Sequence, residues 1–234
     1  MTCPPPPPAS LRFTHVYYDA DDPLANAFAW VSLAPQTILV VYATMICSRR
    51  EAETLLLLLG QLACEASNSV LKRIVRQDRP RYHDAHSPDS LGFGMPSAHA
   101  QFMGFYATYI CLWMYFRAHH FTPAKRRSRT LALVLLTIAV CVSRVYLYYH
   151  TAGQVVIGLL LGTIEGALWC FGVALLRALG IIALLLDTPI ARKWLIKDTA
   201  PYRAFVADEY VAWRRGVELT GEHAHAEDKA VRTA

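Results

Sequence analysis

Residues 130–163 read TLALVLLTIAVCVSRVYLYYHTAGQVVIGLLLGT, and this segment carries the strongest sign of a membrane protein. It opens with an apolar run long enough to cross a bilayer, because a hydrocarbon core of about 30 Å takes about 20 helical residues. A short polar segment around His150 interrupts the run, and a second apolar run begins at Val155. Two apolar helices joined by a tight polar connection predict consecutive crossings of a membrane.

Similar apolar blocks occur along the rest of the 234 residues, of which 54% are hydrophobic. The predicted spans are 27–47, 54–75, 97–116, 130–148 and 155–186. The last block is too long for one straight crossing, and Gly172, Arg177 or Gly180 can mark a tilt, a break or an exit. We therefore predict an all-α, polytopic membrane helical bundle with about five spans.

The blocks also set the domain organisation. We expect an N-terminal lead-in over 1–25, a membrane domain over 26–187 and a cytosolic C-terminal segment over 188–234. The polar end of that segment, after about residue 218, is expected to be disordered. A proline run at 4–8 argues against a secretory signal there, because prolines break the helix that such a signal needs.

The net charge of +5 does not indicate a nucleic-acid partner. The basic residues gather at the ends of apolar blocks, at 72–81 and 125–129, whereas a nucleic-acid reader needs a basic face on a soluble fold. Five of the six cysteines lie in or beside apolar blocks, without the spacing of a zinc site or a disulfide framework. The bilayer is the partner that the composition predicts.

Basic loops tend to stay on the cytosolic side of a membrane. This rule places 48–50 and 118–129 together on that side and the connections 76–96 and 149–151 on the opposite side. The first of these opposite connections is nevertheless basic, through Arg76, Arg79 and Arg81. An anionic ligand would explain cations on the side where the rule does not expect them.

The first polar cluster on that face covers 72–80 and contains Lys72-x6-Arg79-Pro80. An arginine can grip phosphate oxygens in a bidentate fork, and a lysine can add a point charge. The structural alternative is a lysine that extends to the interface beside a loop arginine.

The second cluster covers 96–99, at the start of the third predicted span. Pro96 and Ser97 are typical of a helix start, with Ser97 as the capping residue. A helix N-terminus also attracts anions, and His99 one turn inside it could donate a proton.

The third cluster covers 143–154 and contains Ser143-Arg144-x5-His150-x3-Gln154. Arg144 falls within an apolar helix, where a cation is costly and usually faces a partner or a cavity. His150 and Gln154 are four residues apart, so on a helix the amide could orient the imidazole. Three such clusters on one face indicate a shared site.

Taken together, these clusters resemble the three-part signature of the type 2 phosphatidic acid phosphatase superfamily. That resemblance covers 72–154 and implies a helical membrane bundle related to the vanadium haloperoxidases. Further stretches are similar to the dolichyl-diphosphatase branch of the superfamily. They are Val16-Tyr17-Tyr18-Asp19 with Asp22-Pro23-Leu24, Glu65-x2-Asn68-x2-Leu71-Lys72, and residues 143–151.

The resemblance implies that His150 attacks the terminal phosphorus, that His99 protonates the leaving oxygen, and that water then hydrolyses the phosphohistidine. Gln154 would orient His150. The phosphoryl oxygens would be held by Lys72, Arg79, Ser97, the backbone at Ala98, and Arg144. No cofactor or metal is expected, since Asp78, Asp84 and Asp89 lack the spacing of metal ligands.

Two residues depart from the general signature. Ala98 replaces a glycine, and Gln154 stands where most of the superfamily has an aspartate. A carboxylate would both orient His150 and stabilise its cationic form, whereas an amide can only orient it. A phosphoanhydride has the better leaving group, so we hypothesise that an amide suffices for a diphosphate substrate.

The resemblance further implies a polyprenyl substrate, dolichyl diphosphate, hydrolysed to dolichyl phosphate and phosphate to recycle the carrier lipid of protein N-glycosylation. The protein would then lie in the endoplasmic reticulum membrane with its site facing the lumen. A broader lipid phosphatase acting on phosphatidate-like monoesters, or a non-catalytic lipid-phosphate binding protein, are the alternatives. A transporter would instead spread its polar residues through the depth of the membrane.

Overall fold

The computed structural model describes residues 9–11, 16–80, 92–118, 121–199 and 209–216. Several predictions concern residues outside these ranges, namely the proline run at 4–8, Arg81, Asp84 and Asp89, and the polar end after residue 218.

Apart from one small antiparallel sheet, the elements of the described residues are helices, and four helical segments are long and apolar enough to cross a membrane, so the predicted helical membrane bundle is confirmed. The strands are β1 (Ala9–Leu11) and β2 (Val16–Tyr18). The helices are α1 (Pro23–Val31), α2 (Ala34–Arg49), α3 (Ala52–Val75), α4 (Ala98–Phe116), α5 (Pro123–Tyr146), α6 (Ala152–Ala178), α7 (Ile181–Leu186) and α8 (Pro189–Lys193). A further helical stretch covers 209–216.

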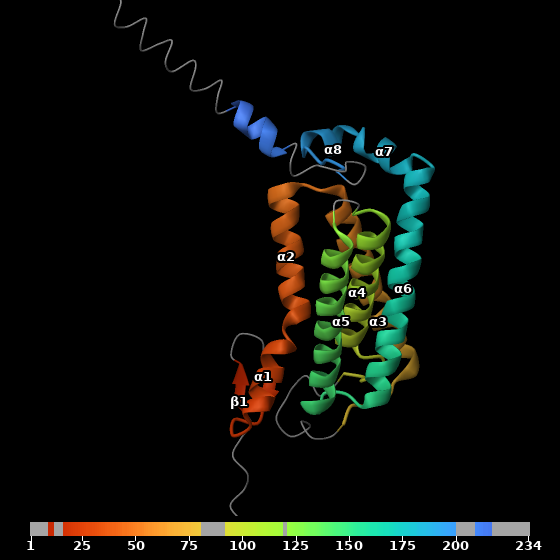
Figure 1. The fold of residues 1–234 in the computed structure, drawn as a ribbon. Helices are drawn as coiled ribbons and strands as arrows, with labels where there is room; N and C mark the ends of the chain where they lie inside the picture. Colours follow the sequence, from red (N-terminus) through yellow and green to blue (C-terminus); the bar gives the residue numbers. More distant parts are fainter. Residues whose placement is uncertain (1–8, 12–15, 81–91, 119–120, 200–208, 217–234) are drawn as a thin grey trace, which may run out of the picture.

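Helix α4 lies inside the bundle against α3, α5 and α6, and α2 stands on the outer side (Figure 1). Met103, Phe105 and Tyr109 of α4 are buried and form the core together with side chains of α2, α3 and α5. The surrounding helices turn apolar side chains outward, such as Leu160 and Leu168 of α6, which are more than half exposed. Apolar outer faces are what helices in contact with lipid require.

Helices α4 and α6 approach backbone to backbone along a row of glycines. A Cβ atom on Gly162 would overlap the carbonyl oxygen of Gln101, and one on Gly158 would lie 2.6 Å from the carbonyl oxygen of Ser97. Gly158, Gly162 and Gly166 are four residues apart and share one helix face, and small residues at this spacing allow close packing of membrane helices. The row therefore fixes the start of α4, at Ser97, against the first turns of α6.

The predicted spans correspond to five long helical segments. Four of them are long and apolar enough to cross a membrane by themselves, namely Pro23–Arg49, Ala52–Val75, Pro123–Tyr146 and Ala152–Ala178. The fifth is the 19-residue α4, which the others surround. The first segment begins at Pro23, earlier than the predicted residue 27, because Asp22 caps α1 by accepting a hydrogen bond from Leu24 N at 2.8 Å.

The long last block ends its crossing at Gly180. Helix α6 stops at Ala178, and Gly180 adopts a left-handed backbone with φ of +74°, which glycine tolerates best. Helix α7 then turns away from the direction of α6 (Figure 1). Of the three positions where a break was predicted, Gly180 is therefore the exit.

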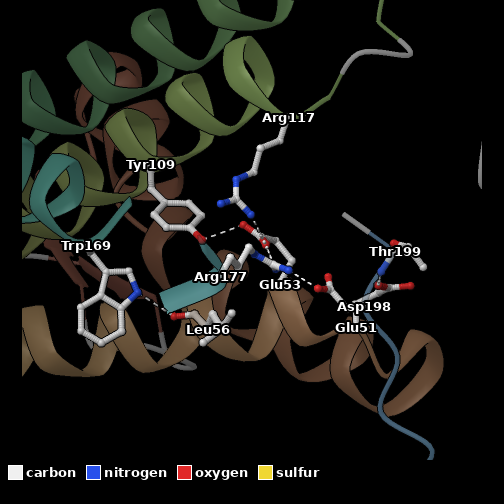
Figure 2. A network of polar contacts seen from close by, with 9 residues as sticks. All are labelled: Glu51, Glu53, Leu56, Tyr109, Arg117, Trp169, Arg177, Asp198 and Thr199. Carbon is white, nitrogen blue, oxygen red and sulfur yellow. Dashed lines mark hydrogen bonds and ion pairs between the residues drawn. The ribbon is translucent and has the colours of Figure 1, made fainter. Parts of the chain in front are cut away.

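The end of the bundle where α2 meets α3 carries paired charges, which we call the ion-pair end (Figure 2). Glu53 of α3 accepts hydrogen bonds from Arg177 at 2.5 Å and from the Tyr109 hydroxyl at 2.7 Å, and Arg117 lies 3.8 Å away. Arg177 also pairs with Asp198. Each of these arginines thus has a carboxylate partner.

The same end holds the chain that follows α8. Lys197 N donates to the Arg50 carbonyl at 3.0 Å, and Ala52 N donates to the Lys197 carbonyl at 2.8 Å. Glu51 accepts from both the backbone N–H and the hydroxyl of Thr199, at 3.3 and 2.8 Å. The segment therefore lies across the turn between α2 and α3.

The three predicted clusters all lie at the other end of the bundle (Figure 1). The connection after α3, the start of α4 and the turn between α5 and α6 meet there. The basic stretches 48–50 and 123–129 lie together at the ion-pair end, as the charge rule predicts.

Candidate active site

The turn that carries His150 begins with a helix C-cap. Tyr148 adopts a left-handed backbone with φ of 58°. The N–H of Tyr149 donates to the Arg144 carbonyl, and that of Tyr148 donates to the Val145 carbonyl, both at 3.0 Å. These bonds satisfy the last carbonyls of α5 in the Schellman pattern, usually with glycine at the left-handed position. A tyrosine in this left-handed conformation is strained, and backbone strain of this kind clusters at functional sites.

The turn closes with a capping box that positions Gln154. The Thr151 hydroxyl accepts from Gln154 N at 3.3 Å, and Gln154 Oε1 accepts from Thr151 N at 3.2 Å. The same Oε1 lies 3.2 Å from His150 Nδ1. The predicted pairing of His150 with Gln154 is therefore present, and the helix cap that holds it was not foreseen.

The amide of Gln154 has a single orientation. Its Nε2 donates to the Asp78 carbonyl at 2.9 Å, so its Oε1 must be the atom that faces Thr151 N and His150 Nδ1. Nδ1 then carries the proton as donor. The other ring nitrogen, Nε2, keeps a lone pair, as a nucleophile requires.

Arg144 is buried, with only 4% of its surface exposed. Its guanidinium stacks on the Tyr149 ring at 4.0 Å, and within the described residues its Nε has no hydrogen-bond partner. The Tyr149 hydroxyl accepts from the backbone N–H of Tyr17 in β2 at 2.8 Å. The N-terminal lead-in therefore braces the ring that holds Arg144, which the sequence did not predict.

Ser97 stands at the N-cap position of α4, but its side chain makes no capping hydrogen bond. The hydroxyl is fully buried and has no partner among the residues that the structure describes. Its backbone N–H donates to the Gln154 carbonyl at 3.1 Å. Capping alone thus fails to account for Ser97, and its hydroxyl remains available to a ligand beside Ala98 and His99 in the first turn.

The predicted residues from the three clusters come together in space. Lys72, Arg79, His99, Arg144 and His150 lie close enough for their charges to interact. Burial, followed by the charges of Arg144 and Arg79, lowers the pKa of His150 to about 3. Its imidazole is therefore neutral at physiological pH.

Two further residues of the site were not predicted. Gly94 N donates to the Gln77 carbonyl at 2.7 Å, which joins the two ends of the 76–96 connection. A Cβ atom on Gly94 would lie 2.8 Å from both amide atoms of Gln154. A glycine close to Pro96 was the available signal, but nothing in the sequence indicated which side chain packs on it.

This arrangement can bind an anion and attack it. It combines the buried Arg144 and the partly buried Lys72 and Arg79 with the Ser97 hydroxyl, a helix N-terminus and a neutral imidazole whose Nε2 keeps its lone pair. Across the described residues no three His, Cys, Asp or Glu side chains converge as metal ligands would.

Known proteins share both the sequence and the fold. The PAP2 superfamily matches residues 53–175. The dolichyldiphosphatase of Saccharomyces cerevisiae is 38% identical over 80% of this chain and 79% of its own length. Dolichyldiphosphatase 1 of Homo sapiens is 33% identical over 88% of this chain and 90% of its own length.

A solved structure has the same fold. The PAP2-type phosphatidylglycerolphosphate phosphatase of Bacillus subtilis aligns with a TM-score of 0.52 at 22% identity, covering 64% of this chain and 77% of that one. The chain belongs to the PAP2 superfamily, on the branch of the dolichyldiphosphatases.

Proposed function

We propose that this protein hydrolyses the terminal phosphoanhydride of dolichyl diphosphate to dolichyl phosphate and phosphate. The relatives named dolichyldiphosphatase, which align over most of both chains, support this substrate. The reaction would return the carrier lipid to protein N-glycosylation in the endoplasmic reticulum membrane. The isoprenoid tail stays in the bilayer, and the diphosphate reaches the end of the bundle where the three clusters meet.

In the first step, Nε2 of His150 attacks the terminal phosphorus, and the bond from phosphorus to the bridging oxygen breaks. His99 donates a proton to that oxygen, so dolichyl phosphate leaves and a phosphohistidine remains. Water then attacks the phosphohistidine while His99 takes back a proton, and the phosphorus–nitrogen bond breaks to release phosphate. Both steps need only the substrate, water and the two histidines.

The other residues of the site stabilise the negative charge of the phosphoryl group. Phosphoryl transfer is catalysed mainly by positioning and by electrostatic stabilisation of the phosphoryl oxygens. Their proposed ligands are Lys72, Arg79, Ser97, the backbone N–H groups around Ala98, and Arg144. We expect full activity in the presence of a chelator, because these groups supply the charge that a metal would otherwise supply.

The observation that carries the proposal is the geometry of His150. Its Nδ1 lies 3.2 Å from an amide oxygen of fixed orientation, and its pKa is lowered to about 3. An imidazole held neutral, with a lone pair on Nε2 and with Arg144, Arg79 and Lys72 nearby, is suited to nucleophilic attack on an anionic phosphoryl group. A binding site for phosphate alone would not need that tautomer.

The test measures phosphate release from dolichyl diphosphate, dolichyl phosphate and phosphatidate by wild-type protein and by His150→Ala. We expect wild type to prefer dolichyl diphosphate and the variant to lose at least about 1,000-fold in rate. A preference for phosphatidate would favour the broader lipid phosphatase. Equal release by the variant would remove His150 as the nucleophile, and no release by wild type would favour a lipid-phosphate binding protein.

We further propose that the site faces the lumen and that the ion-pair end and residues 188–234 face the cytosol. The basic stretches at the ion-pair end support this orientation. Cys47 is exposed near that end, whereas Cys64 and Cys141 are buried. In sealed microsomes, a Cys3→Ser variant should react with a membrane-impermeant maleimide at Cys47. Labelling of Cys47 only after detergent is added would indicate the reverse orientation, with the ion-pair end in the lumen.

A further inference from the structure

A single residue, Gln154, touches all three clusters of the site. Its backbone carbonyl accepts from Ser97 N at 3.1 Å in the second cluster. Its Oε1 lies 3.2 Å from Nδ1 of His150 in the third. Its Nε2 donates to the carbonyl of Asp78 at 2.9 Å, next to Arg79 in the first. Orienting His150 uses only one of these contacts.

The Nε2 end of the amide lies within the base of the 76–96 connection. It lies 3.3 Å from the side-chain oxygen of Gln77, whose backbone carbonyl accepts from Gly94 N at 2.7 Å. A Cβ atom on Gly94 would lie 2.8 Å from the amide of Gln154 and 3.0 Å from Cγ of Arg79. The amide, Gly94 and the stem of Arg79 therefore pack in direct contact, and Gln154 is 1% exposed.

Only a carboxamide can satisfy both ends of this arrangement. His150 and Thr151 present N–H donors and need an acceptor, whereas Asp78 presents a carbonyl and needs a donor. A glutamate would place a second carboxylate oxygen against that carbonyl, and an aspartate is one methylene shorter. The backbone carbonyl of Asp78 is therefore satisfied by a carboxamide at position 154 and would not be satisfied by a carboxylate.

We propose that Gln154 is a positioning residue with two tasks, and that its second task is to hold Arg79 in the phosphate site. Its Oε1 orients His150, and its Nε2 anchors the segment 77–79 through the Asp78 carbonyl. We call this contact the amide clamp, made of Gln154, Gln77, the Asp78 carbonyl and Gly94. This inference rests on the proposed function for the identity of the substrate, whereas the amide clamp affects the binding of any phosphate-like anion at the site.

The first test is Gln154→Glu, which keeps an acceptor for His150 and removes the donor for Asp78. We expect KM for dolichyl diphosphate and the inhibition constant of orthovanadate each to rise about 10-fold, the effect of one lost hydrogen bond at a charged site. The turnover number should fall less than about threefold, because His150 stays oriented. Unchanged KM and vanadate inhibition would overturn the clamp, as would a collapse of turnover at unchanged KM.

The second test displaces the amide and leaves Gln154 in place. Gly94→Ala puts a methyl group against both amide atoms and the Arg79 stem, so it should raise the same two constants. Gly153→Ala is the matched control, since its Cβ would meet only the Thr151 hydroxyl, at 4.0 Å. Equal behaviour of the two alanine variants would overturn the clamp even if Gln154→Glu failed to fold.

Orthovanadate binding also separates this inference from the proposed function. Its dissociation constant can be measured from the thermal shift of purified protein, without any lipid substrate. If wild type binds vanadate and Gln154→Glu weakens that binding, the clamp stands even when dolichyl diphosphate is not hydrolysed. If wild type hydrolyses dolichyl diphosphate and both variants bind vanadate as wild type does, the clamp is wrong and the function stands.

Discussion

The two ends of the bundle place their inward-facing arginines in opposite surroundings, with partly buried arginines at one end and the buried Arg144 at the other. At the ion-pair end, Arg177 pairs with Glu53 and Asp198, and Arg117 lies near Glu53 (Figure 2). At the site, Arg144 is buried and stacks on Tyr149, and the ion pairs among the described residues include neither Arg144 nor Lys72. An unpaired buried cation costs free energy, so a protein keeps it for a ligand that brings the opposite charge.

The carboxylate partners, and not the residue type, distinguish Arg177 from Arg144, which we propose binds phosphate. Arg144 and Arg177 look alike in the sequence, since each is a single cation in a long apolar block. Their contacts differ because α6 delivers Arg177 to carboxylates of α3 and the C-terminal segment. We therefore expect substitutions at the two sites to separate activity from stability.

The largest effect should follow Arg144→Met. We expect kcat/KM for dolichyl diphosphate to fall about 1,000-fold, roughly 4 kcal/mol of transition-state stabilisation. The thermal midpoint should stay level or rise, because the change removes a buried charge without a carboxylate partner. Kinetic assays and a thermal melt of the same preparation measure both quantities. A melt that drops by many degrees would show that Arg144 is structural.

The counterpart is Arg177→Met, which leaves Glu53 and Asp198 without their shared cation. We expect a loss of about 3 kcal/mol in the free energy of unfolding, as when one member of a buried ion pair is removed. Activity of the protein that remains folded should change less than about threefold, because the site lies at the other end of the bundle. Unfolding in denaturant and specific activity at low temperature are the measurements. Unchanged stability would end the contrast between the two ends.

Ligand-linked stability sharpens the same contrast. Orthovanadate at about 100 times its dissociation constant should stabilise wild type by about 2.7 kcal/mol. Arg177→Met should show the same increment from its lower baseline, whereas Arg144→Met should show almost none. Thermal melts with and without vanadate check this. An equal increment in all three proteins would place the anion site elsewhere.

The sequence predicted the spans and the gathering of the three clusters at one end better than it predicted the contacts between their residues. Apolar blocks are long and continuous, so five helical segments could be predicted, and the three clusters fell on one end as expected. The start at Pro23 was missed because a helix cap at Asp22 outweighs the drop in hydropathy. Gly180 was one of three candidate exits, since a glycine shows its left-handed backbone only in the structure.

The supporting residues of the site could not be predicted, for a physical reason. Tyr149, Gln77 and Gly94 act through contacts with partners far along the chain, such as the backbone of Tyr17. No local period or motif encodes such contacts. The Thr151 to Gln154 capping box was local and could have been predicted from its spacing.

The low pKa of His150 predicts a pH dependence of stability. The folded pKa of about 3 lies below the ordinary value near 6.5, so the unfolded state takes up a proton first as the pH falls. The contribution of neutral His150 to the free energy of unfolding is therefore present above pH 6.5 and is lost as the pH falls toward 3. The loss is about 2 kcal/mol at pH 5. Wild type should lose that much more than His150→Gln between pH 7.5 and pH 5 in matched melts. Equal losses would mean that His150 is not buried among cations.

The smallest predicted effect concerns substrate choice and follows Gln154→Asp. An aspartate can stabilise a cationic His150, which matters more for a monoester with its poor leaving group than for a phosphoanhydride. We expect the preference for dolichyl diphosphate over dolichyl phosphate, measured as a ratio of kcat/KM values, to fall about fivefold, or roughly 1 kcal/mol. The shorter side chain also loses the hydrogen bond to the Asp78 carbonyl. That loss weakens the binding of both substrates and therefore cancels in the ratio. An unchanged ratio would show that the amide is kept for the clamp alone and not for the diphosphate.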